Sequence, residues 1–225
     1  MRTPRVREEP RISVNKLGEY MLASPARRRR LLQDQKNPPP FMVTYYDDAM
    51  APIREFYELG GTDDRVVTNA MDRIAARIPA TDFEEQRNNS CIEALAAFLD
   101  LLDDFSLADY GVRLGEPDPP KLVVSGVQIS VRPELLLYRE NELVGAVKFN
   151  IAKGSPLERQ AAEYIAATVH QYVEEMLARG NALAQDSFVV DLFSKRYLRA
   201  PRSSKRRRRD VEAACEEIAA RWATL

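Results

Sequence analysis

The stretch from residue 131 to residue 151, VRPELLLYRENELVGAVKFNI, constrains the fold of this chain more than any other. It holds two short apolar runs separated by Arg139-Glu140-Asn141-Glu142, a polar connection of hairpin length. Glu134 opens the first run just after a proline, and Lys148 lies well inside the second. Burying a lysine within a strand is costly unless it has a partner or a task. The pattern therefore predicts a hairpin that carries a functional pair, Glu134 and Lys148.

The length and composition predict one substantial hydrophobic core. The chain has 225 residues, of which 45% are hydrophobic, enough for a single domain with additional segments. No apolar run approaches the roughly 18 residues of a membrane span, and the basic N-terminus lacks an apolar signal region. We therefore expect a cytoplasmic location and no membrane partner.

Several classes of active site are disfavoured by the residues that the chain lacks. Cys91 and Cys215 lie in helical patterns without metal-ligand spacing, so both are expected to be reduced. The single histidine, His170, follows a buried helical position and is expected to pack or face solvent. A zinc site and a Ser/His or Cys/His nucleophile are therefore not expected. No Gly-rich phosphate loop appears, so ATP is not expected as a cofactor.

The net charge of −1 conceals a strong asymmetry along the chain. Residues 1–36 carry ten Lys/Arg and four Asp/Glu, and residues 195–209 carry nine Lys/Arg and no acid. These segments contribute +6 and +9, which leaves −16 for the remainder. Basic segments on an acidic body suggest a polyanionic partner.

Two runs of basic residues are the candidate contacts to that partner. The first follows Ser24-Pro25, a favourable helix start, and the second is expected in a linker before the C-terminal helix. A solvated surface is the alternative interpretation of both runs. The candidate nucleic-acid-binding residues are Arg27, Arg28, Arg29, Arg30, Lys205, Arg206, Arg207, Arg208 and Arg209.

The order of patterns predicts an α/β fold with a mixed central sheet and flanking helices. Helices are expected over 46–59, 63–78 and about 82–102, followed by strands over 122–131 and through the hairpin. A helix to about Ala178, a strand over 186–194 and a C-terminal helix complete the chain. We expect a basic arm and helical region at 1–80, a core at 81–200, and a basic linker with the last helix at 201–225.

This αβββαβ order, with Pro133-Glu134 and Lys148 on neighbouring strands, resembles the PD-(D/E)XK nuclease superfamily and its restriction-endonuclease-like core. In that superfamily an acid follows a proline on one hairpin strand, and a second acid and a lysine, two residues apart, lie on the next. The resemblance implies phosphodiester cleavage, in which carboxylates hold Mg²⁺ or Mn²⁺ and the lysine orients water or stabilises the transition state.

Two further stretches resemble the RecB-like branch of the superfamily. Gln160 and Tyr164 match its Q-x-x-x-Y element, and one helical turn between them would project both side chains toward the site. Ser13, Leu17 and Tyr20 resemble the serine-led start of those nucleases, with Ser24-Pro25 in place of Cys-Pro. The iron–sulfur cysteines of some relatives are missing, so no cluster is expected.

Three features depart from the nuclease pattern: the first acid is Glu134 rather than Asp, the helix-borne histidine common in the RecB-like branch is absent, and the second acid is missing. The acid expected two residues before Lys148 is Ala146, which cannot bind a metal. The second carboxylate could have moved to the long helix, with Glu85 as the first choice and Glu93 as the second. Glu134 and Glu85 would then hold Mg²⁺. Alternatively, the fold has lost its metal and only binds.

The resemblance thus implies a metal-dependent deoxyribonuclease with Glu134, Lys148, Gln160 and Tyr164 as catalytic residues. One rival is a degenerate nuclease-fold subunit of a larger complex, for example in phage defence or DNA processing. Another is an interaction protein whose C-terminal helix docks a protein partner or a second copy. DNA is the expected partner, RNA stays open, and Asp191 is interpreted as an edge-strand acid or an extra ligand.

Overall fold

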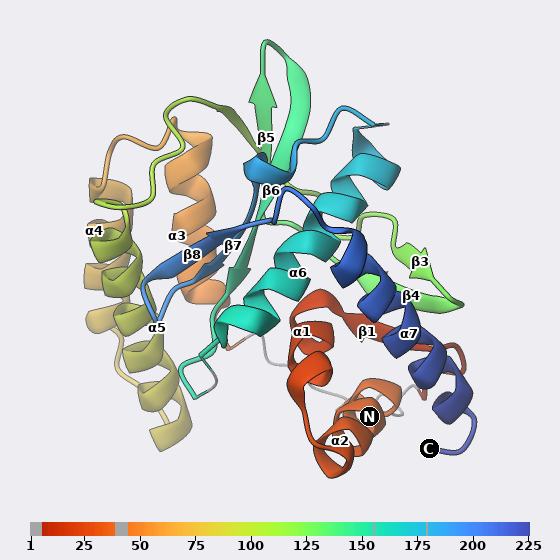
Figure 1. The fold of residues 1–225 in the computed structure, drawn as a ribbon. Coiled ribbons are helices and arrows are strands. Elements are labelled where there is room, and N and C mark those ends of the chain that lie inside the picture. Colours follow the sequence, from red (N-terminus) through yellow and green to blue (C-terminus); the bar gives the residue numbers. More distant parts are fainter. Residues whose placement is uncertain (1–5, 39–44, 155, 179) are drawn as a thin grey trace.

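The computed structural model describes residues 6–38, 45–154, 156–178 and 180–225. The first five residues of the expected N-terminal arm therefore lie outside the described residues. Within these ranges, seven α-helices and eight β-strands form an α/β protein with a five-stranded and a three-stranded sheet. Figure 1 shows the larger sheet running through the middle of the molecule, between two groups of helices. The α/β class and the mixed sheet are thus confirmed.

The five-stranded sheet has the order β2-β5-β6-β7-β8. Its strands β6 and β7 run parallel, joined through a helix, and the other neighbouring pairs are antiparallel. The sheet consists of β2 (Gly111–Leu114), β5 (Leu135–Arg139), β6 (Glu142–Asn150), β7 (Ser187–Asp191) and β8 (Arg196–Arg199).

The predicted hairpin is β5 and β6. Between them, Glu140 and Asn141 have φ values of 49° and 67°, both in the left-handed region. Two consecutive positive φ values define a two-residue turn whose twist matches that of the strands. The register places Ala146 opposite Leu136, and a bulge occurs between Leu137 and Tyr138. The hairpin therefore lies at the centre of the sheet, as the sequence predicted.

The two faces of this sheet are covered by different helices (Figure 1). Val147 and Phe149 of β6 point into an apolar cluster with α3 (Asp47–Glu58), α4 (Arg65–Ala75) and α5 (Asp82–Leu101). Ala146, on the alternate face, joins a second cluster with α1 (Val14–Leu22) and α6 (Arg159–Tyr172). Because Lys148 alternates with Val147 and Phe149, it belongs to the face covered by α1 and α6.

The predicted strand over 122–131 is instead a second hairpin in a separate sheet. Its strands are β3 (Leu122–Val124) and β4 (Val127–Ser130), and β4 pairs in parallel with β1 (Arg11–Ser13). In the central sheet, the strand next to the hairpin is β2, where the sequence predicted residues 122–131. The prediction of strand character was right, whereas the prediction of its place in the main sheet was wrong.

The remaining helices are α2 (Pro25–Lys36) and α7 (Lys205–Trp222). Ser24 caps α2, because its Oγ accepts a hydrogen bond from the Arg27 amide. The basic run from Lys205 to Arg209, expected in a linker, instead forms the first turns of α7, and β8 precedes it. Among the described residues, no helix has the length and apolarity needed to cross a membrane.

Candidate functional site

The predicted pair, Glu134 and Lys148, meets at the start of the central hairpin. The Glu134 amide donates to the carbonyl of Val147, which places Glu134 beside β6 at the end of β5. Lys148 Nζ lies 2.6 Å from Glu134 Oε1, and the two side chains are 13% and 11% exposed. An ion pair so little exposed is held in an environment of lower dielectric than water, where charge interactions are strong. The structure therefore brings these two predicted residues together.

Arg132 completes the surroundings of the lysine. Its carbonyl oxygen accepts a second hydrogen bond from Lys148 Nζ, at 2.9 Å. Arg132 has φ of 46°, although it is not a glycine and precedes Pro133, where extended backbone is favoured. A left-handed backbone costs such a residue about 1–2 kcal/mol. This strained carbonyl helps fix the position of the ammonium group, and backbone strain of this kind concentrates at functional sites.

The carboxylate of Glu134, the predicted metal ligand, is already engaged within the protein. Both oxygens of Glu134 accept hydrogen bonds, Oε1 from Lys148 and Oε2 from the Phe149 amide at 2.7 Å. Ala146 is fully buried in the apolar cluster with α1 and α6. Glu134 is therefore a carboxylate satisfied by the protein itself.

Glu85, the predicted second ligand, belongs to α5 on the other side of the sheet. It is exposed and lines a hollow of about 640 Å³ together with Glu93. Glu93 forms an ion pair with Lys153. Because α5 packs on the face that carries Val147 and Phe149, the sheet separates α5 from Lys148. The sequence located Glu85 on the correct helix but did not indicate which face that helix covers.

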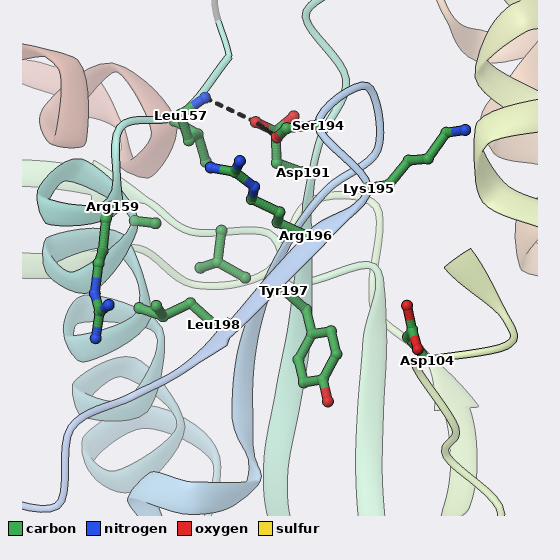
Figure 2. Close-up of a pocket in the computed structure, with 11 residues that line it drawn as sticks. Asp104, Leu157, Arg159, Asp191, Ser194, Lys195, Arg196, Tyr197 and Leu198 are labelled. Atoms are coloured by element: carbon green, nitrogen blue, oxygen red, sulfur yellow. Dashed lines mark hydrogen bonds between the residues drawn. The ribbon is translucent and has the colours of Figure 1, made fainter. Parts of the chain in front are cut away.

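A row of polar groups crosses the ends of β6 and β7, on the same face as Lys148. Asn150 Nδ2 donates to Asp191 Oδ1 at 3.4 Å, and Asp191 Oδ2 accepts from the Leu157 amide at 2.7 Å. Figure 2 shows this last contact, beside a hollow of about 630 Å³ that Arg159 and Arg196 also line. Asp191 thus fixes the segment that leads into α6. Its hydrogen bonds agree with the interpretation as a hydrogen-bonding acid, but the expected edge position was wrong, because β7 lies between β6 and β8.

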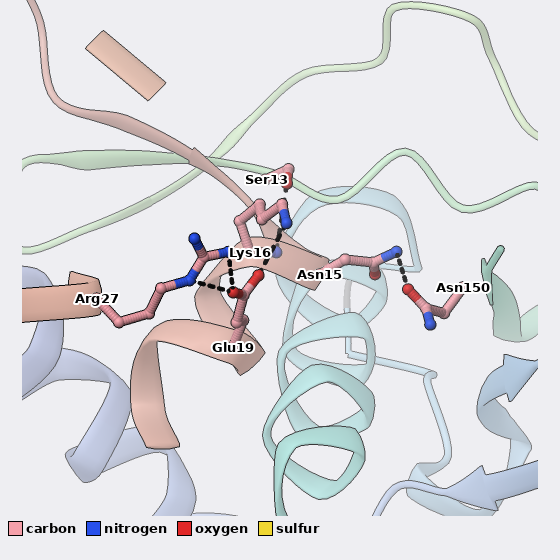
Figure 3. A network of polar contacts seen from close by, with 6 residues as sticks. All are labelled: Ser13, Asn15, Lys16, Glu19, Arg27 and Asn150. Atoms are coloured by element: carbon pink, nitrogen blue, oxygen red, sulfur yellow. Dashed lines mark hydrogen bonds and ion pairs between the residues drawn. The ribbon is translucent and has the colours of Figure 1, made fainter. Parts of the chain in front are cut away.

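Asn15, which sequence reasoning missed, joins this row from α1. Its Nδ2 donates to the Phe149 carbonyl at 3.2 Å and contacts Asn150 Oδ1 at 3.4 Å (Figure 3). One turn further along α1, Glu19 accepts from Lys16 and Arg27. Burial alone would raise the pKa of Glu19, but these two cations outweigh it and lower the pKa. The contact of Asn15 with the end of β6 joins residues more than a hundred positions apart, so only the fold brings them together.

Gln160 and Tyr164, which the resemblance implies near the site, face the start of α7. The Tyr164 hydroxyl donates to Asp210 of α7 at 2.9 Å. Both residues line a hollow of about 380 Å³ between α6 and the start of α7, with Arg206 and Arg207. Burial raises the pKa of Tyr164, and the hydrogen bond to Asp210 raises it further. Within the described residues, neither side chain forms a hydrogen bond to Glu134 or Lys148.

The first basic run divides into fixed and projecting cations. Arg27 pairs with Glu19, and Arg28 pairs with Glu217 of α7 at 3.1 Å. Arg29 and Arg30 are exposed and form no ion pair within the described residues. Half of this run therefore holds the fold together, and the other half faces solvent.

The second basic run divides in the same way. Arg207 pairs with Glu163 of α6, and Arg208 pairs with Glu174 at 2.6 Å. The side chains without an ion pair in the described part of the chain are Lys205, Arg206 and Arg209. Since the run begins a helix of 18 residues, it lies about 25 Å along the axis from the other end of α7, which contacts α2. The projecting cations of the two runs thus form separate basic surfaces.

Comparison of the sequence with known protein families and with curated proteins finds no match.

Proposed function

We propose that this protein binds nucleic acid through a nuclease-like α/β core that has lost its metal site. The observation that carries the proposal is the contact between Glu134, just before β5, and Lys148 of the neighbouring strand β6. The chain order through this sheet is helix, three strands, helix and strand, formed by α5, β2, β5, β6, α6 and β7. This order is similar to the αβββαβ order of the PD-(D/E)XK superfamily, and a Glu just before β5 beside a Lys within β6 supports the proposal.

The chemistry of the pair favours binding over cleavage. A metal-dependent nuclease needs carboxylate oxygens that are free to hold a divalent cation. Here Lys148 and the Phe149 amide both donate to Glu134. Two residues before Lys148, where the superfamily has its second acid, this chain has the buried Ala146. The superfamily's cleavage chemistry therefore lacks its second ligand, while the projecting cations of α2 and α7 are available to phosphates.

Salt-dependent binding of short single- and double-stranded DNA and RNA, measured by fluorescence anisotropy, tests the proposal. Replacing Lys205, Arg206 and Arg209 together by Gln removes three cations without breaking an ion pair in the described residues. If all three contact phosphates, the slope of log K against log salt should fall by about 2–3 units. Arg65→Gln is the matched control, because Arg65 pairs with Asp63 on the remote helix α4.

Binding should be unchanged by EDTA. No measurable binding of the wild-type protein to any of these nucleic acids at low salt would contradict the proposed function.

The second candidate function is Mg²⁺-dependent cleavage of DNA, and the Glu134–Lys148 contact also favours it. It requires a rearrangement in which Glu134 exchanges a hydrogen bond for a metal ligand bond. Incubation of labelled DNA with Mg²⁺ or Mn²⁺ tests this function, with Lys148→Met as the decisive variant. Metal-dependent cleavage that Lys148→Met abolishes would establish this candidate, and cleavage that persists in the variant would point to a contaminating nuclease.

A further inference from the structure

Three arginines lie at the outward face of the three-stranded sheet. Along β1 and β4, Ile12 and Ile129 point into the core, so their neighbours point outward. Arg11 is one of these outward residues, and Arg132 lies two residues beyond the end of β4. Arg7 precedes β1. We refer to Arg7, Arg11 and Arg132 as the arginine face.

Each of these arginines is held by a different part of the fold. The Arg7 amide donates to the Lys36 carbonyl at 2.9 Å, and its Nη1 donates to the Gln35 carbonyl at 3.0 Å. Arg11 is fixed by the pairing of β1 with β4. Arg132 Nη2 donates to Asp118 Oδ1 at 2.9 Å. Two segments distant in sequence, the one that leads into β1 and the one that follows β4, therefore carry the three arginines, and the pairing of β1 with β4 brings these segments together.

The three cations interact unfavourably with one another. Burial lowers the pKa of Arg7, and the charges of Arg11 and Arg132 lower it further. Burial likewise lowers the pKa of Arg11, and Arg132 adds to this effect. Within the described residues, Asp118 is the carboxylate that pairs with this face, and it is 72% exposed. Asp118 pairs with both Arg132 and Lys121, so its single negative charge is shared between two cations. Positive charge therefore remains in excess on the arginine face.

Glu9, whose carboxylate contacts Gln128 of β4, does not remove this excess by an ion pair within the described residues. Glu9 Oε2 accepts a hydrogen bond from Gln128 Nε2 at 2.6 Å, and the described residues show no ion pair between Glu9 and an arginine. A cluster of guanidinium groups with donors left over is suited to an anion that can accept several hydrogen bonds at once. A phosphate presents such oxygens, and the guanidinium fork matches them in pairs.

We propose that the arginine face binds a phosphate group of the nucleic acid, and that Asp118 occupies this place until the phosphate displaces it. This inference rests on the proposed function. Arg132 connects the two sites, because its guanidinium belongs to the face and its carbonyl holds Lys148. A strand whose phosphate lies on the arginine face would therefore continue toward the Glu134–Lys148 pair.

Opposite effects of two substitutions test the inference. Arg11→Gln should weaken DNA binding and lower the salt slope by about 0.7–0.9 units, the value of one phosphate contact. Asp118→Asn should strengthen binding severalfold, because it removes the competing carboxylate. Arg65→Gln again serves as the control, and thermal melts check that each variant is folded. Unchanged affinity in both Arg11→Gln and Asp118→Asn would overturn the inference.

A second measurement separates this inference from the proposed function. If the α7 variant weakens DNA binding but Arg11→Gln does not, the function stands and the arginine face is excluded as a contact. If the wild-type protein binds no nucleic acid, the arginine face can still be tested with inorganic pyrophosphate, by measuring the change in melting temperature in a thermal-shift assay. Stabilisation by pyrophosphate that Arg11→Gln abolishes would show a site for free phosphates, and no stabilisation would overturn the inference.

Discussion

His170 lies between α6 and α7 and is 8% exposed. Its Nε2 lies 3.4 Å from the Ala182 carbonyl, and its Nδ1 lies 3.2 Å from Arg208 Nη2. In the neutral ring, Nε2 donates to the carbonyl and Nδ1 accepts from the guanidinium. Protonation would place an N–H of the ring against Arg208. Burial lowers the pKa of His170 below 6.5, and the positive charge of Arg208 lowers it further. The negative charge of Glu174 raises the pKa but does not outweigh these effects.

We expect His170 to make the protein less stable in acid. Because the folded state lowers its pKa, the unfolded chain takes up a proton first as the pH falls through about 6.5. Above that pH, the neutral His170 contributes its full share to the stability of the folded state. This share is lost as the pH falls from about 6.5 toward the lower pKa that His170 has in the folded state. Urea unfolding at about pH 7.5 and about pH 5.5 measures this loss.

His170→Gln provides the comparison, since glutamine can still hydrogen bond but does not titrate. Carboxylates contribute equally to both proteins, so the variant should lose less stability between the two pH values than the wild type. An equal loss in both proteins would show that His170 does not titrate in this range.

Single residues could be predicted where the chemistry is local. A glutamate after a proline and a lysine within an apolar strand identified the pair that the structure brings to 2.6 Å. Arg132 and Asn15 were missed, because a left-handed backbone before a proline and a contact from α1 to the end of β6 leave no local pattern. Which face of the sheet α5 covers depends on the whole fold. Glu85 was expected beside Glu134, but α5 covers the opposite face from Lys148.

At the scale of elements, α1 and α6 pack unusually closely at Gly18. A Cβ atom added there would lie 2.5 Å from Ile165 Cγ1 and 3.1 Å from the Ala161 carbonyl oxygen. Gly18 is buried within α1, where glycine costs a helix about 1 kcal/mol relative to alanine. The close approach of the two helices explains a glycine at this position.

Gly18→Ala should therefore destabilise the protein despite its better helix propensity. Overpacking typically costs about 1–3 kcal/mol, which equals or exceeds the gain in propensity. The free energy of urea unfolding measures the balance. Gly154→Ala is the control, because nothing lies within 4 Å of the added Cβ, and we expect its effect to stay within about 0.5 kcal/mol. Greater stability of Gly18→Ala would mean that the helices can separate at no cost.

Elements with strong local signals were predicted closely, and short strands were not. The helix expected at about 82–102 begins after the Thr81 cap and ends at Leu101. By contrast, β2 has four residues and β8 lies in the basic segment, so neither has an apolar pattern. β3 and β4 have the pattern of strands, but their sheet is completed by β1, more than a hundred residues earlier. Periodicity reveals strands, and it does not reveal their partners.

At the scale of the molecule, α7 joins the two ends of the described chain. Its apolar face is buried in the cluster that also contains α1 and α6. Trp222 is 3% exposed, and its Nε1 donates to the Arg7 carbonyl at 3.2 Å. Lys36 Nζ, at the end of α2, donates to the Trp222 carbonyl at 2.8 Å. The sequence predicted this amphipathic helix, but not that its apolar face packs within the same chain.

Trp222→Ala should consequently destabilise the chain by about 3 kcal/mol, the usual cost of removing a large buried aromatic side chain. Arg221→Ala is the matched control on the next residue, where an exposed i,i+4 pair with Glu217 is lost. Its expected effect is at most about 0.5 kcal/mol. Urea unfolding gives both values, and size-exclusion chromatography with light scattering gives the mass of each protein.

These two measurements also decide between packing within the chain and docking of α7 onto a second copy. If the apolar face stabilises its own chain, Trp222→Ala lowers the free energy of unfolding, and the folded variant keeps the wild-type mass. If the face joins two copies, unfolding of the wild type depends on protein concentration and Trp222→Ala halves its mass. The burial of Trp222 against Arg7 and the core favours the first result.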